Sequence, residues 1–133
     1  MVSKKVLVVD DEAHIRHIMA MKLSNAGYKV LTAEDGEEAL EVCLAERPQL
    51  VITDYQMPLM TGLEMCRQLR QHDQTRQLPV LMLTARGFDI PPQEMASAGI
   101  LDVLSKPFSP REVLEKVRTL IGQAGSETVV ESS

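Results

Sequence analysis

Five strand-like runs, separated by stretches with helical periodicity, are the feature that most constrains the fold of this chain. The runs cover residues 5–9, 28–33, 50–52, 79–83 and 100–104. Short, almost continuous apolar runs are typical of strands that are buried on both faces of a sheet. In the intervening stretches, apolar residues recur at three- and four-residue intervals, as on the buried side of a helix. Strands that alternate with helices predict an α/β fold in which helices cover both faces of a parallel sheet.

Capping patterns set the limits of the predicted helices. Three helices begin with Asp, Thr or Ser followed by Glu three residues later, which is the spacing of a capping box. These caps are Asp35, Thr61 and Ser109. Gly27 ends the first helix, and Pro91-Pro92 begins a short fourth helix that ends at Gly99. Because the last helical pattern stops near residue 121, we predict one domain over residues 1–121 and a flexible tail over residues 122–133.

Chemically distinctive side chains follow four of the five predicted strands, at the point where each strand ends. Asp10 and Asp11 follow the first strand and Asp54 follows the third. Thr84 and Lys106 follow the fourth and fifth strands. The carboxyl ends of parallel strands meet at one edge of the sheet, where open α/β sheets bind their ligands. The sequence therefore predicts that these five side chains form one site.

The predicted site combines three carboxylates with one ammonium group and one hydroxyl group. Carboxylates that converge on one point repel each other unless a cation is bound. Mg²⁺ fits this set, since it is held by a few carboxylates and also accepts phosphate oxygens, whereas Ca²⁺ needs more protein oxygens. An Asp carboxylate can also attack phosphorus and hold the group as an aspartyl-phosphate. The metal and Lys106 would neutralise the phosphoryl oxygens, and Thr84 would donate a hydrogen bond to them.

The ordered set of motifs resembles the receiver domain of two-component response regulators, single-domain chemotaxis regulators included. The motifs are VLVVDDE at 6–12, DYQMP at 54–58, TA at 84–85 and KPF at 106–108. None of them is specific alone, but their order on successive strands is highly specific. The resemblance covers about residues 4–121. It implies a flavodoxin-like sheet of five parallel strands in the order 2-1-3-4-5, flanked by five helices.

The resemblance also implies a phosphoacceptor and a set of metal ligands. Asp54 would be the phosphoacceptor and would receive its phosphoryl group from a histidine kinase or a phosphotransfer protein. Asp11 would bind Mg²⁺ directly and Asp10 mostly through water, together with Asp54 and the backbone carbonyl of Gln56. The protein would catalyse only its own phosphorylation and dephosphorylation.

By the same resemblance, two further residues would respond to the phosphoryl group. Thr84 would move toward it, and Lys106 would bridge it to the acids, beside a cis peptide bond to Pro107. Phosphorylation would then switch contacts with an effector protein that the sequence does not identify.

Two departures from the family pattern affect the expected output. The position three residues before Lys106 usually carries an aromatic residue, but here it is Val103, which cannot hide and expose a ring. Pro91-Pro92 also shortens the fourth helix, which belongs to the usual signalling face of the family. Gln56 and Arg86 occupy positions that tune the lifetime of the phosphoryl group in the family.

Two alternative functions remain open at this point. Val103 favours a pseudo-receiver, an interaction module that keeps the fold but does not switch, although the full set of five site residues opposes this reading. A Mg²⁺-dependent phosphatase acting through an aspartyl-phosphate is the third reading. Such enzymes commonly have an acid two residues after the nucleophile, whereas this chain has Gln56.

The composition limits the classes of partner and the cellular location that we expect for this protein. The net charge is −5 and there is no basic block, so we expect no direct contact with nucleic acid. No apolar run approaches the roughly 20 residues of a membrane-spanning helix, and the amino terminus lacks a signal-peptide pattern. We therefore expect a cytoplasmic protein, with Cys43 and Cys66 buried and reduced.

The organisation of the whole protein is less constrained by the sequence. Only the predicted tail follows residue 121, so we expect no output domain. A stand-alone regulator and a receiver from a longer protein both remain open, as do a monomer and a weak dimer. Among the eight methionines, we expect Met57 and Met60 on an exposed loop after Asp54 and the others in the core.

Overall fold

Five parallel strands form one sheet, in the order β2-β1-β3-β4-β5, in the computed structural model, which describes residues 4–85 and 90–124. The strands are β1 (Lys5–Val9), β2 (Lys29–Ala33), β3 (Leu50–Asp54), β4 (Val80–Thr84) and β5 (Ile100–Ser105). Every neighbouring pair in the sheet is parallel. The order reverses between β1 and β3, so the loops after these strands diverge there and leave space at the sheet edge. The predicted fold class and strand order are confirmed.

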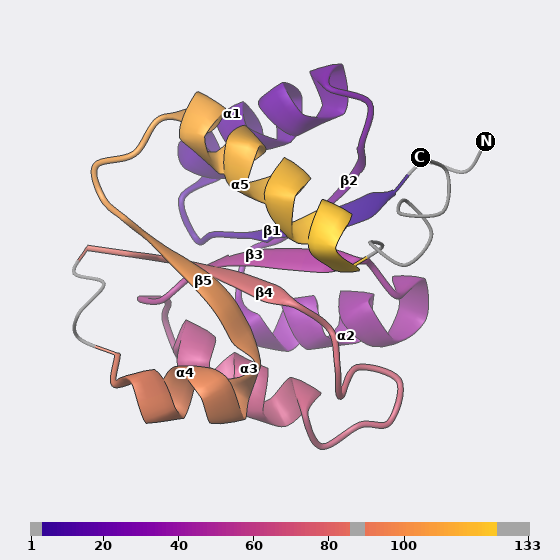
Figure 1. Ribbon diagram of the computed structural model, residues 1–133, viewed down its shortest axis with the longest axis vertical. Helices are drawn as coiled ribbons and strands as arrows, with labels where there is room; N and C mark the ends of the chain where they lie inside the picture. The colour runs from indigo at the N-terminus through magenta and orange to yellow at the C-terminus, as the bar shows by residue number, and fades with distance from the viewer. Residues whose placement is uncertain (1–3, 86–89, 125–133) are drawn as a thin grey trace.

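Five helices cover the two faces of this sheet (Figure 1). They are α1 (Ala13–Asn25), α2 (Gly36–Glu46), α3 (Gly62–Leu69), α4 (Pro92–Ala98) and α5 (Pro110–Ala124). Figure 1 shows α1 and α5 on one face, and α2, α3 and α4 on the other. Within the described residues, none of these helices has both the length and the apolar character that crossing a membrane requires.

The last helix is longer than the sequence pattern predicts. α5 continues to Ala124, three residues past the predicted limit at residue 121. The helix continues through Gly122, since a glycine inside a helix costs only about 1 kcal/mol. Residues 125–133, the rest of the predicted tail, lie outside the described residues. The division into a domain and a flexible tail therefore stays a prediction.

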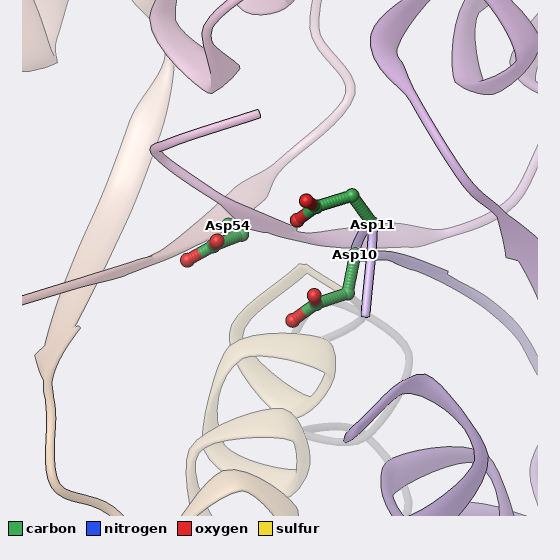
Figure 2. A group of neighbouring side chains, drawn as sticks. All are labelled: Asp10, Asp11 and Asp54. Carbon is green, nitrogen blue, oxygen red and sulfur yellow. The ribbon is translucent and has the colours of Figure 1, made fainter. Parts of the chain in front are cut away.

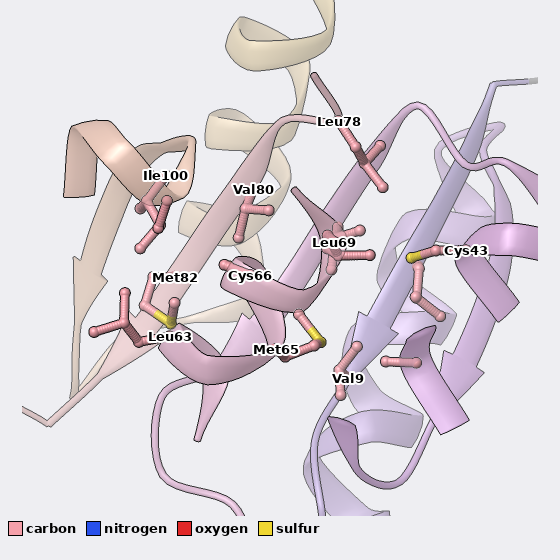
Figure 3. Packing of buried hydrophobic residues seen from close by; sticks show 14 of the residues in the cluster. Val9, Cys43, Leu63, Met65, Cys66, Leu69, Leu78, Val80, Met82 and Ile100 are labelled. Carbon is pink, nitrogen blue, oxygen red and sulfur yellow. The ribbon is translucent and has the colours of Figure 1, made fainter. Parts of the chain in front are cut away.

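The continuous apolar runs of the central strands fill two separate cores. In β1, Leu7 and Val9 pack with α2 and α3, whereas Val6 and Val8 pack with α1 and α5. Successive side chains of a strand point to opposite faces, so a strand covered on both sides needs apolar residues at every position. Figure 3 shows the core on the α2–α3–α4 side. This core contains both cysteines, which are free and buried, as expected.

The helix caps follow the sequence closely. Thr61 and Glu64 form a complete capping box, and Ser109 and Glu112 exchange the same pair of hydrogen bonds at the start of α5. The Asp35 side chain accepts the N–H of Glu38 at 2.8 Å, but the Glu38 carboxylate accepts the N–H of Glu34 instead of closing the box. These reciprocal bonds satisfy N–H groups that a helix start leaves without partners.

Candidate functional site

The predicted site residues converge at the carboxyl edge of the sheet. Asp10, Asp11 and Asp54 offer carboxylate oxygens that all lie within 4.8 Å of one another (Figure 2). Asp10 and Asp11 follow β1, and Asp54 is the last residue of β3. β1 and β3 are neighbours in the sheet, so the carboxyl groups that follow them are brought together by strand pairing alone.

Asp10 is the most enclosed of the three acids. It is fully buried, and its Oδ1 accepts the N–H of Glu12 at 2.9 Å. Its Oδ2 is buried and has no hydrogen-bond partner among the described residues. Burial raises the pKa of Asp10, the hydrogen bond from Glu12 opposes this rise, and the charge of Asp54 adds to it. A buried carboxylate oxygen without a partner is costly, and a bound cation would satisfy it.

Asp54 forms an ion pair with Lys106 across the site. The Lys106 Nζ lies 3.0 Å from Asp54 Oδ1, and Asp54 is only 5% exposed. Burial raises the pKa of Asp54 even though the hydrogen bond and the charge of Lys106 act to lower it. Burial also acts to lower the pKa of Lys106, but Asp54 outweighs this effect and the pKa is raised. Each member of the pair therefore favours the charged form of the other.

Thr84 and Lys106 are brought beside Asp54 by the pairing of the last three strands. Asp54 pairs with Leu83 in the sheet register, and Thr84 pairs with Ser105. The ladder continues past the strand ends, where the N–H of Lys106 donates to the Thr84 carbonyl at 2.8 Å. Thr84 is buried, and the Lys106–Pro107 bond is cis, as the resemblance implied.

The loop after β3 is held close to the site by Gly62, a residue that the sequence reading did not single out. A Cβ at this position would lie 2.5 Å from the Asp54 carbonyl oxygen and 2.9 Å from Met82 Sδ. The N–H of Gly62 donates to the Tyr55 carbonyl at 2.8 Å, which joins the start of α3 to the end of β3. The glycine two residues before the Glu of a predicted capping box was the available sequence signal, but the close approach is a tertiary contact.

The same loop corrects one expectation and adds a new feature. Met57 is only 9% exposed and packs in the core, so the expectation of an exposed Met57 is wrong. Leu59 is the exposed residue instead, at 99%, and its φ of 72° is unusual for a residue other than glycine. The loop therefore presents Leu59 to solvent and Met57 to the core.

Gln56 lies on the open side of the acidic cluster. It is exposed and lines a hollow of about 450 Å³ together with Asp11, Met57, Pro58 and Thr61. The role of its backbone carbonyl as a metal ligand stays a prediction. Val103 is half-buried and packs against the core on the α4 side. Arg86 lies outside the described residues.

A contact that the sequence did not reveal fixes the loop of the two adjacent acids. The Arg16 Nη1 atom, on α1, donates to the backbone carbonyl of Asp10 at 2.7 Å. An arginine in the second turn of a helix is ordinarily a surface residue, so composition and spacing gave no signal for this role.

The fold and the site define the class of flavodoxin-like α/β domains that carry an acidic pocket at the carboxyl edge of the sheet. Comparison with known families specifies the class further. Residues 6–118 match the family model of the response regulator receiver domain. The chain belongs to this family, and it is therefore a receiver domain of two-component signalling.

Curated relatives agree with this assignment. The alkaline phosphatase synthesis transcriptional regulatory protein PhoP of Bacillus subtilis is 43% identical over 90% of this chain and 49% of its own length. The phosphate regulon transcriptional regulatory protein PhoB of Pseudomonas aeruginosa is 37% identical over 94% of this chain and 55% of its own length. The chain spans about half the length of these relatives.

Solved structures show the same fold. The chemotaxis protein CheY4 of Vibrio cholerae superposes with a TM-score of 0.80 and 39% identity, over 90% of this chain and 99% of CheY4. The receiver domain of the sensor histidine kinase PA1611 from Pseudomonas aeruginosa also gives a TM-score of 0.80, at 26% identity, over 91% of this chain and 99% of that domain. The PA1611 domain has a magnesium ion coordinated in its active-site cleft.

Proposed function

We propose that this receiver domain accepts a phosphoryl group on Asp54, in a Mg²⁺-dependent reaction with the phosphohistidine of a histidine kinase or a phosphotransfer protein. One observation carries the proposal. Asp54 ends a buried strand with its carboxylate 3.0 Å from the Lys106 ammonium and within 4.8 Å of the carboxylates of Asp10 and Asp11. A nucleophile, a fixed cation and a candidate metal site therefore lie together at one edge of the sheet.

The chemistry assigned to Asp54 follows from its surroundings. A carboxylate oxygen of Asp54 attacks phosphorus, a P–O bond forms, and the P–N bond to the donor imidazole breaks with its electron pair leaving on nitrogen. Burial raises the pKa of Asp54, while the hydrogen bond and the charge of Lys106 act to keep the carboxylate ionised, which is the form that attacks phosphorus. Lys106 offsets part of the cost of keeping it ionised.

The acidic cluster fits a divalent cation. Asp10 Oδ2 is buried without a partner among the described residues, and the carboxylates of Asp11 and Asp54 are within reach of the same ion. We assign Asp10, Asp11, Asp54 and the Gln56 carbonyl as the residues that would hold Mg²⁺. When bound, Mg²⁺ would neutralise charge on the transferring phosphoryl oxygens. The magnesium ion of the PA1611 receiver domain supports this assignment.

Lys106 and Thr84 are the groups we assign to hold the phosphoryl group after transfer. Lys106 would exchange its contact with Asp54 for a phosphoryl oxygen, and the Thr84 hydroxyl would donate a hydrogen bond. These movements would shift the population between two conformations and so alter contacts with an effector protein. Because Val103 has no ring to reorient, the response would have to pass through backbone and core packing near β5.

The downstream partner is part of the same proposal. The relatives PhoP and PhoB are transcriptional regulators about twice as long as this chain. Our expectation that these 133 residues make no direct contact with nucleic acid rests on their net charge of −5, and it stays a prediction for this part alone. We therefore expect the effector to be either a separate protein or a domain that is covalently linked to this one.

Backbone NMR shifts with Mg²⁺ and beryllofluoride, a phosphoryl mimic, test the proposal. We expect shifts at the site and across α4, β5 and α5 in the wild type, and none from beryllofluoride in Asp54→Asn. Shifts confined to the site would favour a non-switching module. Multiple turnover of a phosphomonoester that Asp54→Asn abolishes would favour the phosphatase reading instead.

A further inference from the structure

The backbone and side chain of Asp10 are held by three hydrogen bonds that leave one oxygen free. Its N–H donates to the Ala33 carbonyl at 3.2 Å, which extends the β1–β2 ladder by one residue. Its Oδ1 accepts the N–H of Glu12 at 2.9 Å, and its carbonyl accepts Arg16 Nη1 at 2.7 Å. The remaining Oδ2 is buried and unpartnered among the described residues. The acid is thus fixed around the oxygen that a cation would use.

The bond from Arg16 acts on Asp11 as well. The Asp10 carbonyl and the Asp11 N–H belong to one planar peptide unit, so fixing the direction of the carbonyl also fixes the start of Asp11. Asp11 is exposed, so the peptide plane that it shares with Asp10 helps to set the position of its backbone. A single guanidinium group therefore orients the segment that carries two of the three carboxylates.

We propose that Arg16 is a positioning residue for the metal site, an inference that rests on the proposed function. It aligns Asp10 and Asp11 through the backbone carbonyl of Asp10 and contacts neither the metal nor the phosphoryl group. Arg16 is half-buried on α1, and the charge that acts to lower the pKa of Asp10 is that of Lys106. Its contribution is one of geometry.

The charge of Arg16 and its hydrogen bond to the Asp10 carbonyl predict opposite changes in Mg²⁺ affinity when Arg16 is removed. Loss of a cation that contacts the backbone of Asp10 would strengthen Mg²⁺ binding by Coulomb attraction alone. Loss of the bond to the Asp10 carbonyl would free the peptide plane and weaken binding. Groups that orient metal ligands typically change metal affinity by about 10- to 100-fold when they are mutated. The sign of the change therefore separates the two explanations.

The test is a Mg²⁺ titration of the full chain by calorimetry at neutral pH and low salt. The variants are Arg16→Met, Arg16→Lys and a control, Lys22→Met, which removes an exposed cation from the last turn of the same helix. We expect about tenfold weaker Mg²⁺ binding in Arg16→Met. Arg16→Lys should recover most of the affinity, since a long side chain with a donor can still reach the carbonyl. Lys22→Met should bind Mg²⁺ as the wild type does, or slightly more tightly.

The outcomes separate this inference from the proposed function. A wild type that does not bind Mg²⁺ would overturn the proposed function and the inference with it. A wild type that binds while Arg16→Met binds equally or more tightly would overturn the inference alone, as would an equal loss in Lys22→Met. Thermal unfolding without Mg²⁺ checks that each variant is folded. If Arg16→Met is not folded, Arg16→Gln, which is too short to reach the carbonyl, takes its place with the same expected loss.

Discussion

Asp10 and Asp54 are acids placed where burial opposes their charge. Both have a raised pKa, with burial as the largest cause. A carboxyl group whose pKa is raised on folding favours the folded state most at pH values below its ordinary pKa of 3.8. That contribution is lost as the pH rises through the folded pKa. At neutral pH the acidic site therefore destabilises the protein, as binding sites often do when no ligand is bound.

The first prediction concerns Asp10→Asn, which removes the buried charge but keeps the shape of the side chain. We expect an increase of about 1–2 kcal/mol in the free energy of unfolding at pH 7 without Mg²⁺. The gain should shrink as the pH falls toward 3.8, where the wild-type acid is protonated as well. Urea unfolding at several pH values measures it, with the exposed Glu41→Gln as control. A less stable Asp10→Asn at pH 7 would contradict this account.

A second residue-scale prediction tests the ion pair at the site. Lys106 acts to lower the pKa of Asp54 through its hydrogen bond and its charge. Lys106→Met removes both effects and keeps most of the apolar stem, so the pKa of Asp54 should rise further. Carboxyl ¹³C NMR titration of Asp54 reads this directly. An unchanged or lower pKa in the variant would show that the pair does not couple in solution.

At the scale of elements, Arg70 joins α3, the α3–β4 loop and the end of α4. Among the described residues, its guanidinium donates to the backbone carbonyls of Thr75, Arg76, Leu78, Ala98 and Gly99. Gly99, with φ of 76°, ends α4 directly against this group, where a Cβ would collide with the guanidinium. Three segments of chain therefore depend on one side chain for their hydrogen bonds.

The third prediction compares Arg70→Met with Arg67→Met on the same helix. Loss of Arg70 leaves several half-buried carbonyls without donors, and we expect a loss of about 3 kcal/mol in unfolding free energy. Arg67 forms one exposed ion pair with Glu94 at 3.2 Å, so its variant should change stability by less than about 0.5 kcal/mol. Chemical denaturation measures both. Similar losses in the two variants would refute the role given to Arg70.

The elements that the sequence predicted are those specified by neighbouring residues. The strand runs and the caps at Thr61 and Ser109 act within three or four residues, and they recur in the structure. The acceptors of Arg70 lie 5 to 29 residues away, and Arg16 reaches back across the end of β1, so no local pattern encodes either contact. The expectation for Met57 was wrong because its burial is a tertiary contact with the core, which no local pattern encodes.

For the site, the sequence predicts which residues come together but not the geometry of their side chains. The positions of Asp10, Asp54 and Lys106 follow from strand ends in a parallel sheet, so convergence could be inferred from order along the chain. The pairing of Lys106 with Asp54 at 3.0 Å and the unpartnered Oδ2 of Asp10 are side-chain geometry. Only the assembled sheet determines them.

For the whole molecule, the two buried thiols report on the integrity of the core on the α2–α3–α4 side of the sheet. Cys43 and Cys66 are fully buried, and burial raises the pKa of each thiol to about 12. Thiolate is the reactive form, so the native protein should react with a thiol reagent only as fast as it unfolds. The fourth prediction is that labelling rates in urea follow the unfolding rate measured by circular dichroism. Rapid labelling of the native protein would contradict the packing of α2 and α3 on the sheet.

The central claim is that Asp54 accepts the phosphoryl group with the help of a divalent cation. Intact-protein mass after incubation with acetyl phosphate tests it most directly, with Mg²⁺ or with EDTA, beside an Asp54→Asn control. We predict one acid- and base-labile phosphoryl adduct, formed only with Mg²⁺ and absent from the control. An adduct that persists in Asp54→Asn, or none on the folded wild type with Mg²⁺, would contradict the account.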